Sequence, residues 1–484
     1  MEYMMEGYTM SIQVDIAVLG GGPGGYTAAI RAAQAGKSVA LVEMDKVGGT
    51  CLHKGCIPTK ALLRSAEVYR QLLEHAAYGL DVKVDYSSFR FESVQEVKLE
   101  KVNQLYKGLQ GLMKRYGIQM INGRGRVIGP SIFSPRSGSL AVELHNGETE
   151  SVVSKHLIIA TGATTRQVKG LEADGQYILS SDHILELQEL PKSILIVGGG
   201  VIGVEWASLL QDFGVEVTIV ELGNRILPGE DSEISLEMTK QLTKRGIRIL
   251  TGVQLQIESY TTDEKGFQIT AQLSEGNVQL EAEKMLVSIG REANCHSIGL
   301  ENTDVAIKNG VIAVNEYGQT SEPHIYAIGD VVGGLQLAHA ASHEAIVAVD
   351  HILGRHPNLV AKHQIPRCIY SYPEVASYGF TEAEAIANGY ELEKSKVPFS
   401  AIGKAIVQGD TAGFVKVIAN KANDDLLGVH IIGGHATEMI SETVIAGWLN
   451  ASPWEIGNVV HAHPTLSEAI MEAMLAVDGQ SISL

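Results

Sequence analysis

Two glycine-rich turns constrain the fold of this 484-residue chain more than any other feature. The glycines have G-x-G-x-x-G spacing, with Gly20, Gly22 and Gly25 in the first turn and Gly198, Gly200 and Gly203 in the second. An apolar, β-branched run precedes each turn, and a helix-forming segment and a second apolar run follow it, which is typical of a βαβ unit. Such a unit binds a dinucleotide, because its glycines allow a tight turn, approach of the backbone to a pyrophosphate and close helix packing. The sequence therefore predicts an α/β fold with two Rossmann-like dinucleotide-binding domains.

An acid stands at the end of the second apolar run in both units. Glu43 and Glu221 each lie 23 residues after the first glycine of their turn, where a carboxylate accepts from a ribose 2′-hydroxyl. At Glu221 the negative charge favours NAD over NADP, and Arg225 lies beyond the strand end. We expect one tightly held and one exchanging dinucleotide, FAD and NAD, because a flavin passes two electrons between a hydride and a dithiol.

Two of the four cysteines, Cys51 and Cys56, lie five positions apart in GGTCLHKGCIP. A disulfide needs Cα atoms about 4.4–6.8 Å apart, whereas five extended steps span about 17 Å. A bridge would require the segment to curl into a tight helical turn, and a helix beginning there would favour a thiolate. A zinc site is not expected, since only His53 and distant histidines are available as further ligands. A redox couple and a passive structural bridge both fit the residues.

Near the C-terminus, HAHPTLSEAI places Glu468 five residues after His463. A carboxylate that holds one imidazole nitrogen fixes the tautomer and makes the other nitrogen a better base. A thiol needs such a base before it becomes a good nucleophile. Alone the pattern is a weak signal of catalysis, but it gains weight beside the cysteine pair.

Together these motifs resemble those of the flavin-dependent pyridine nucleotide-disulfide oxidoreductases, from Val14 to about Ile482. The resemblance implies that Cys51 and Cys56 form a redox-active disulfide, with Cys56 facing the flavin and Cys51 exchanging with the substrate. It also implies that His463 is the general base and Glu468 its orienting partner. In this family the His463 motif reaches the disulfide of the opposite subunit, which implies an obligate homodimer with shared active sites.

The resemblance assigns further cofactor contacts. Lys60 corresponds to a lysine beside the flavin that pairs with Glu205, and an exposed helix lysine is the alternative. The remaining expected flavin contacts are Gly125, Thr161, Gly162, Asp330 and Ala338, and the remaining expected NAD contacts are Val253 and Gly290. The alternative for these residues is that they form turns at strand ends and contact no ligand. This alternative has most weight at Val253 and Gly125.

Within the family, the motifs are most similar to those of members that oxidise protein-bound dihydrolipoyl groups and pass hydride to NAD⁺. This similarity implies two partners, the lipoyl domain and the subunit-binding domain of a dihydrolipoamide acyltransferase. The alternatives are another disulfide reductase, acting on glutathione or mercuric ion, and a scaffold protein with inactive sites. An intact set of two cysteines, a histidine and an acid argues against the scaffold.

Composition excludes several function classes. The formal net charge of −18 disfavours binding to nucleic acid or anionic lipid, and no apolar run reaches the length of a membrane span. The four cysteines in 484 residues argue against a disulfide-stapled secreted protein and favour the cytoplasm. The first thirteen residues lack the features of a secretory signal, and we expect a tail there.

The order of the motifs predicts the domain organisation. We expect a flavin domain at 14–160, an NAD domain at 161–285, the second part of the flavin domain at 286–356, and an α+β dimerisation domain at 357–484. The amphipathic stretch 89–117 carries charges of both signs, and it predicts a pair of helices within the flavin domain rather than a membrane segment.

Overall fold

The computed structural model describes residues 11–85, 89–130 and 136–483. These residues form two compact units. The first comprises the described residues within 11–61, 95–166 and 291–359, and the second comprises those within 62–94, 167–290 and 360–483. Most of the predicted N-terminal tail lies outside the described residues, and the first strand begins at Ile12.

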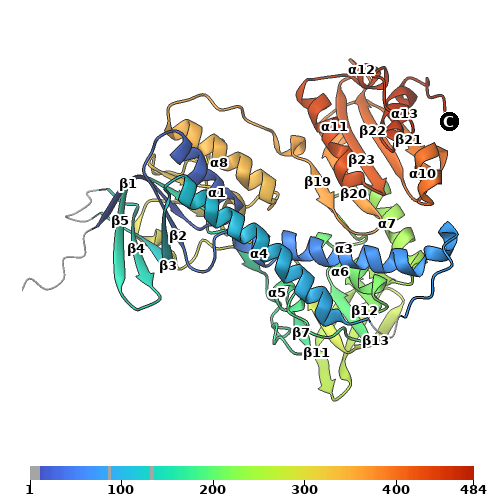
Figure 1. Ribbon diagram of the computed structural model, residues 1–484, viewed down its shortest axis with the longest axis horizontal. Helices are drawn as coiled ribbons and strands as arrows, with labels where there is room; N and C mark the ends of the chain where they lie inside the picture. The colour runs from blue at the N-terminus through green and yellow to red at the C-terminus, as the bar shows by residue number, and fades with distance from the viewer. Residues whose placement is uncertain (1–10, 86–88, 131–135, 484) are drawn as a thin grey trace, which may run out of the picture. The chain divides into compact units, whose positions relative to one another are not determined.

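The first unit is built on a six-stranded sheet. Its strands are β1 (Ile12–Leu19), β2 (Val39–Glu43), β3 (Gln119–Ile128), β4 (Ser139–Leu144), β5 (Thr149–Ile159) and β18 (Ile325–Ala327). Strands β3, β2, β1, β5 and β18 are parallel neighbours in that order, and β4 pairs antiparallel with β3 and β5. Helices α1 (Pro23–Gln34) and α8 (Ala338–Ile352) lie side by side over one face (Figure 1). Their alanines pack on the β-branched side chains of β1, which explains the small-residue composition of α1.

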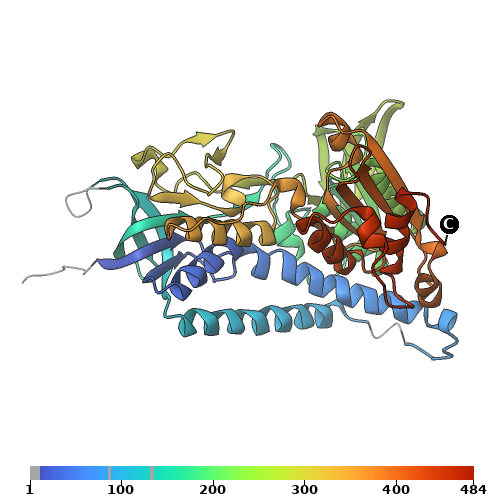
Figure 2. The ribbon, with the colours of Figure 1, turned by 90° about the horizontal axis from the view of Figure 1, so that it is seen from above.

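Two helices follow the first βαβ unit. The short α2 (Gly49–His53) precedes the longer α3 (Cys56–Leu73). The predicted helical pair within 89–117 is wrong, because α4 (Phe91–Arg115) is a single helix of 25 residues, uninterrupted in Figure 2. Its two internal glycines, Gly108 and Gly111, do not break it, since a helix tolerates glycine at a cost of only about 1 kcal/mol each.

The second unit contains a five-stranded parallel sheet in the order β10, β9, β8, β14, β7. The strands are β7 (Ile178–Leu179), β8 (Ser193–Val197), β9 (Glu216–Glu221), β10 (Arg248–Thr251) and β14 (Lys284–Val287). Helix α6 (Val201–Asp212) connects β8 to β9, and α7 (Ser232–Lys244) connects β9 to β10. An antiparallel sheet of β11 (Gln254–Asp263), β12 (Gly266–Leu273) and β13 (Gly276–Ala282) precedes β14. The β8–α6–β9 unit repeats the arrangement of β1–α1–β2.

The C-terminal part of the second unit has a five-stranded antiparallel sheet. Its strands are β19 (Arg367–Ile369), β20 (Glu374–Gly379), β23 (Leu426–Gly433), β22 (Phe414–Asn420) and β21 (Leu392–Pro398), in that order. Helices α11 (Ala436–Trp448) and α13 (Glu468–Val477) pack on one face of this sheet, and α12 (Pro453–Gly457) packs on α13 (Figure 1). A mostly parallel sheet and a fully parallel sheet, each with crossover helices, together with this α+β part confirm the predicted fold class.

A buried ion cluster lies between α7 and the C-terminal sheet. Lys416, on β22 and only 2% exposed, binds three carboxylates: Asp231 at 2.9 Å, Glu233 at 2.9 Å and Glu382 at 2.8 Å. Burial alone would raise the pKa of Asp231, but the hydrogen bond from Lys416 leaves that pKa below its ordinary value. Because a buried cation is stable only with such partners, the cluster fastens the start of α7 to β22.

Among the described helices, those of 18 residues or more, α3 and α4, contain charged side chains. Within the described residues, no helix combines the length and the apolarity that crossing a bilayer requires.

Candidate active site

The first glycine turn leaves an open space in front of helix α1. Gly20, at φ +102°, touches the end of β5, since a Cβ there would lie 2.3 Å from the Ala160 carbonyl oxygen. A Cβ at Gly25 would lie 1.8 Å from the Gly20 carbonyl oxygen, so only glycine permits this packing of α1. A Cβ at Gly22 meets nothing within 4 Å. The amides at the start of α1 therefore face free space that suits a phosphate.

The carboxylate of Glu43 lies at the edge of this space. Its Oε2 accepts from the Gly21 amide at 2.7 Å, and its Oε1 accepts from the Asp45 amide at 2.8 Å. Each carboxylate oxygen can accept a further hydrogen bond. Glu43 is thus fixed in place with acceptor capacity left for a hydroxyl group.

The second glycine turn repeats this geometry. A Cβ at Gly203 would lie 2.0 Å from the Gly198 carbonyl oxygen, and a Cβ at Gly200 meets nothing within 4 Å. Glu221 accepts from the Gly199 amide at 2.7 Å and from the Gly223 amide at 2.7 Å. The predicted glycines and acids of both turns therefore form two cradles of the same design.

A glycine in left-handed conformation lies just beyond the neighbouring strand in each cradle. Gly162 follows β5 at φ +70° and Gly290 follows β14 at φ +112°, and a Cβ on either would meet nothing within 4 Å. The Thr161 hydroxyl donates to the Asn294 carbonyl oxygen at 2.8 Å, which fixes the segment before Gly162. Both glycines therefore leave open space beside their turn.

Asp330 lies in a short 3₁₀ turn, η4 (Gly329–Val332), after β18. Burial raises the pKa of its carboxyl group above the ordinary value, and Arg291 opposes the shift. The turn is held by Glu344 of α8, whose Oε2 accepts from the Gly329 amide at 2.7 Å. Sequence reasoning did not identify Glu344, because no motif marks an acid that contacts a turn fifteen residues earlier. Ala338 is the first residue of α8.

Cys51 lies within α2, and Cys56 is the first residue of α3. The predicted tight helical turn is therefore present, and the positive end of the 18-residue helix α3 lies at Cys56. The two thiols are within hydrogen-bonding range, and this bond, burial and the charge of Cys56 raise the pKa of Cys51. A negative charge on one sulfur thus makes loss of the second proton unfavourable.

Three other side chains affect the electrostatics of the thiol pair. Lys60 on α3 lowers the pKa of Cys51, and Asp330 raises it. Burial raises the pKa of Tyr26 on α1, and the two cysteines raise it further. Both cysteines, Lys60 and Asp330 therefore lie together within the first unit, with Tyr26 as a neighbour that sequence reasoning missed.

His463 and Glu468 form a direct contact in the second unit. His463 Nδ1 lies 2.8 Å from Glu468 Oε1, and the Thr465 amide donates to Glu468 Oε2 at 2.8 Å. Because an ionised carboxylate only accepts, Nδ1 carries the hydrogen and Nε2 keeps a lone pair. The imidazole is 78% exposed, so Nε2 is accessible to a reacting group.

The other predicted contacts have local structural partners. Glu205 is 4% exposed, and its Oε1 accepts from the Tyr370 amide at 2.9 Å. Val253 is buried and donates from its amide to the Glu221 carbonyl oxygen at 3.0 Å. A Cβ at Gly125 would lie 2.5 Å from Leu19 Cδ1 and 3.0 Å from Val42 Cγ1, so packing between the strands by itself favours a small residue there. The predicted Lys60–Glu205 pair would join the two units and stays a prediction.

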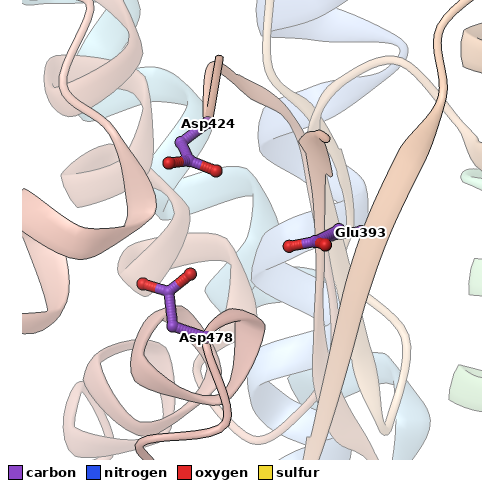
Figure 3. Close-up of side chains that lie close together, drawn as sticks. All are labelled: Glu393, Asp424 and Asp478. Carbon is purple, nitrogen blue, oxygen red and sulfur yellow. The ribbon is translucent and has the colours of Figure 1, made fainter. Parts of the chain in front are cut away.

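The described residues bring together one group of three potential metal ligands, Glu393, Asp424 and Asp478. Their carboxylates point toward one another from β21, the β22–β23 turn and the end of α13 (Figure 3). Exposed acidic groups are common without an ion. His53, the residue considered as a zinc ligand beside the cysteines, instead donates from Nε2 to the Val47 carbonyl oxygen at 3.0 Å.

Comparisons with known proteins agree with this geometry. The family model described as pyridine nucleotide-disulphide oxidoreductase matches residues 14–345, and the model for the dimerisation domain of that family matches residues 365–474. The chain is 55% identical to a dihydrolipoyl dehydrogenase of Bacillus subtilis (strain 168), over 98% of this chain and 100% of the relative. It is 41% identical to a dihydrolipoyl dehydrogenase of Zymomonas mobilis, over 98% and 100% of the two chains.

Two solved structures have the same fold. LpdA from Mycobacterium tuberculosis matches with a TM-score of 0.87 and 25% identity, over 96% of this chain and 99% of that one. The HOCl-induced flavoprotein disulfide reductase RclA from Escherichia coli matches with a TM-score of 0.81 and 27% identity, over 95% and 99%. With both family models covering consecutive parts of the sequence, this chain belongs to the pyridine nucleotide-disulphide oxidoreductase family.

Proposed function

We propose that the chain is a dihydrolipoyl dehydrogenase, which oxidises protein-bound dihydrolipoyl groups to lipoyl groups and reduces NAD⁺. The observation that carries this proposal is the thiol pair of Cys51 and Cys56 with Lys60 and Asp330 around it, in a unit that also contains a dinucleotide cradle. The relatives named dihydrolipoyl dehydrogenase, similar over the full length of the chain, support the choice of substrate.

The residues of both cradles fit a dinucleotide. The first, with Gly20, Gly22, Gly25 and Glu43, would hold FAD, and the second, with Gly198, Gly200, Gly203 and Glu221, would hold NAD. We assign Lys60, Gly125, Thr161, Gly162, Asp330 and Ala338 to FAD, and Glu205, Val253 and Gly290 to NAD. Bound FAD supplies two-electron chemistry between a dithiol and a nicotinamide. A negative charge at Glu221 disfavours a 2′-phosphate, which argues for NAD over NADP and against a glutathione reductase.

The protein's own residues then carry out thiol–disulfide exchange. His463 accepts a proton at Nε2 from one dihydrolipoyl thiol, and the resulting thiolate attacks Cys51 of the Cys51–Cys56 disulfide. The disulfide breaks, a mixed disulfide forms, and Cys56 leaves as a thiolate favoured by the start of α3. The second substrate thiol then attacks the substrate sulfur of the mixed disulfide and passes its proton to the departing Cys51, which leaves a lipoyl disulfide, a Cys51 thiol and a Cys56 thiolate. Glu468 stabilises the positive charge on His463 throughout.

We also propose an assembly and an organisation. The match to a dimerisation domain supports a homodimer, in which we place His463 opposite the partner subunit's cysteine pair. The net charge of −18 suits docking to a basic subunit-binding domain of an acyltransferase, which also carries the lipoyl domain. The flavin domain would span 14–160 and 286–356, the NAD domain 161–285 and the dimerisation domain 357–484. The low cysteine content favours the cytoplasm.

The test is reduction of NAD⁺ by dihydrolipoamide with the purified protein, compared with turnover of glutathione and of mercuric ion. We expect a yellow protein that is active with dihydrolipoamide. Cys56→Ser should abolish turnover while the flavin stays bound. Preference for another disulfide substrate, or full activity of the Cys56→Ser protein, would contradict the proposal.

A further inference from the structure

A second histidine lies two residues before His463 and is held by an acid from another helix. His461 Nε2 lies 2.5 Å from Glu442 Oε1 of α11, and His461 Nδ1 lies 2.8 Å from the Val459 carbonyl oxygen. The imidazole of His461 is 7% exposed, whereas that of His463 is 78% exposed. The two neighbouring histidines therefore have opposite surroundings.

The hydrogen-bond partners decide what His461 can do. A backbone carbonyl oxygen only accepts hydrogen bonds, so Nδ1 of His461 must donate. The carboxylate of Glu442 then accepts from Nε2, or a protonated Glu442 donates to it. In either case both ring nitrogens are engaged within the chain. His461 has no lone pair free to accept a proton from a substrate, unlike Nε2 of His463.

The segment around these histidines has little packing of its own. Within the single chain, Val459 is 59% exposed and Val460 is 96% exposed, so apolar burial against the chain's own core does not fix the backbone that leads to His463. On the C-terminal side, Glu468 binds both His463 and the Thr465 amide. On the N-terminal side, the hydrogen bond between His461 and Glu442 has the equivalent role. It connects the segment to helix α11, whose inner face is packed in the core.

We propose that Glu442 and His461 are positioning residues for His463. The pair fixes the backbone before the base, so that Nε2 of His463 points to one place while Glu468 holds Nδ1. This inference rests on the proposed function, because it concerns the proton transfer from a dihydrolipoyl thiol. Small misplacements of a catalytic group reduce rates strongly, and we expect the effect only in the half-reaction that uses His463.

The experiment measures both half-reactions by stopped-flow in the dimeric, flavin-loaded enzyme. Flavin reduction by dihydrolipoamide requires His463, whereas flavin reduction by NADH does not. The variants are Glu442→Gln, His461→Gln, the double variant and Glu442→Asp. The matched control is Glu438→Gln, which removes the same charge from an exposed position one turn earlier on α11. Light scattering and thermal unfolding check that each variant remains a folded dimer.

We expect Glu442→Gln and His461→Gln each to slow flavin reduction by dihydrolipoamide about ten-fold, with reduction by NADH unchanged. The double variant should be no slower than the slower single variant, because the two residues act as one pair. Glu442→Asp should recover part of the rate, and Glu438→Gln should behave as the wild type.

Three results would overturn the inference. A Glu442→Gln enzyme with the wild-type rate would show that the pair does not position the base. Equal losses in both half-reactions, or a dissociated dimer, would show a general structural role instead. A His461→Gln effect that adds to that of Glu442→Gln would show that the two residues act separately. A wild-type protein without activity toward dihydrolipoamide would refute the proposed function, which is a different outcome from these three.

Discussion

Replacing Glu221 by glutamine should change the nucleotide preference of the enzyme. The Glu221 carboxylate accepts from two backbone amides at 2.7 Å each, and these bonds fix the turn of the second cradle. Glutamine has one acceptor oxygen, so one amide would face an N–H donor instead. A hydrogen bond to a charged group is worth about 1.5–3 kcal/mol. Because Glu221 is partly exposed, we expect the lower value, which is about ten-fold in kcat/KM for NAD⁺.

The same substitution should improve the use of NADP⁺. Two like charges about 4 Å apart repel by about 1 kcal/mol in water and by about 4 kcal/mol at the effective dielectric near a protein surface. Loss of the carboxylate charge removes this repulsion toward a 2′-phosphate, so kcat/KM for NADP⁺ should rise about ten-fold. The preference for NAD⁺ should therefore narrow by about a hundred-fold in total.

The assay is steady-state reduction of NAD⁺ and of NADP⁺ by dihydrolipoamide at one fixed ionic strength, since salt screens the charge effect. Glu216→Gln is the matched control. Glu216 is exposed and begins the same strand, β9, so this substitution removes the same charge at a position away from the cradle. An unchanged kcat/KM for NAD⁺ would refute the assignment of Glu221 to the ribose. Loss of NAD⁺ turnover without any gain for NADP⁺ would show that the carboxylate matters only for the turn.

Two further predictions concern the framework of the site. Gly25→Ala should give a protein without flavin colour, because the new Cβ would lie 1.8 Å from the Gly20 carbonyl oxygen; Gly108→Ala in α4, where a Cβ meets nothing within 4 Å, should keep the flavin. Lys416→Met should lower the free energy of unfolding by about 3–5 kcal/mol in a urea titration, because it leaves the buried Asp231 carboxylate without its cation, whereas Glu233 and Glu382 keep Lys396 and Lys394. Because the pKa of Asp231 is lowered in the folded protein, its ionised carboxylate stabilises the fold at pH values above the ordinary carboxyl pKa. This stabilisation is lost as the pH falls through the lowered pKa. The Lys416→Met protein lacks it, so its free energy of unfolding should fall less on acidification than that of the wild type.

Spacing in the sequence predicted the parts of the site that depend on local geometry. The glycines of both turns, Glu43 and Glu221 lie where the βαβ pattern places them, and the five-residue step from His463 to Glu468 allows their 2.8 Å contact. Other parts depend on packing between distant segments. A glycine is expected at Gly125 as a ligand contact, but the side chain of Leu19, 2.5 Å from where a Cβ would lie, also favours a small residue there. Spacing cannot distinguish these two causes, because both disfavour a Cβ.

The closure of the two cradles shows most clearly what spacing cannot predict. The Gly48 amide donates to the Gly21 carbonyl oxygen at 2.8 Å, and the Leu227 amide donates to the Gly199 carbonyl oxygen at 2.8 Å. Both donors have positive φ, +115° at Gly48 and +48° at Leu227, so equivalent hydrogen bonds are made by different residue types in different positive-φ conformations.

The surroundings of each donor explain the difference. A Cβ at Gly48 would lie 2.4 Å from Leu52 Cδ2 of α2, so the helix that carries Cys51 leaves room only for glycine. In the second cradle no such helix comes directly after the donor, and the Leu227 side chain is 2% exposed in the core. A left-handed leucine costs about 1–3 kcal/mol, and burial of its side chain contributes about 1.5–3 kcal/mol. Burial thus offsets the strain at Leu227, whereas at Gly48 the side chain of Leu52, in the helix that carries Cys51, occupies the space that a side chain would need.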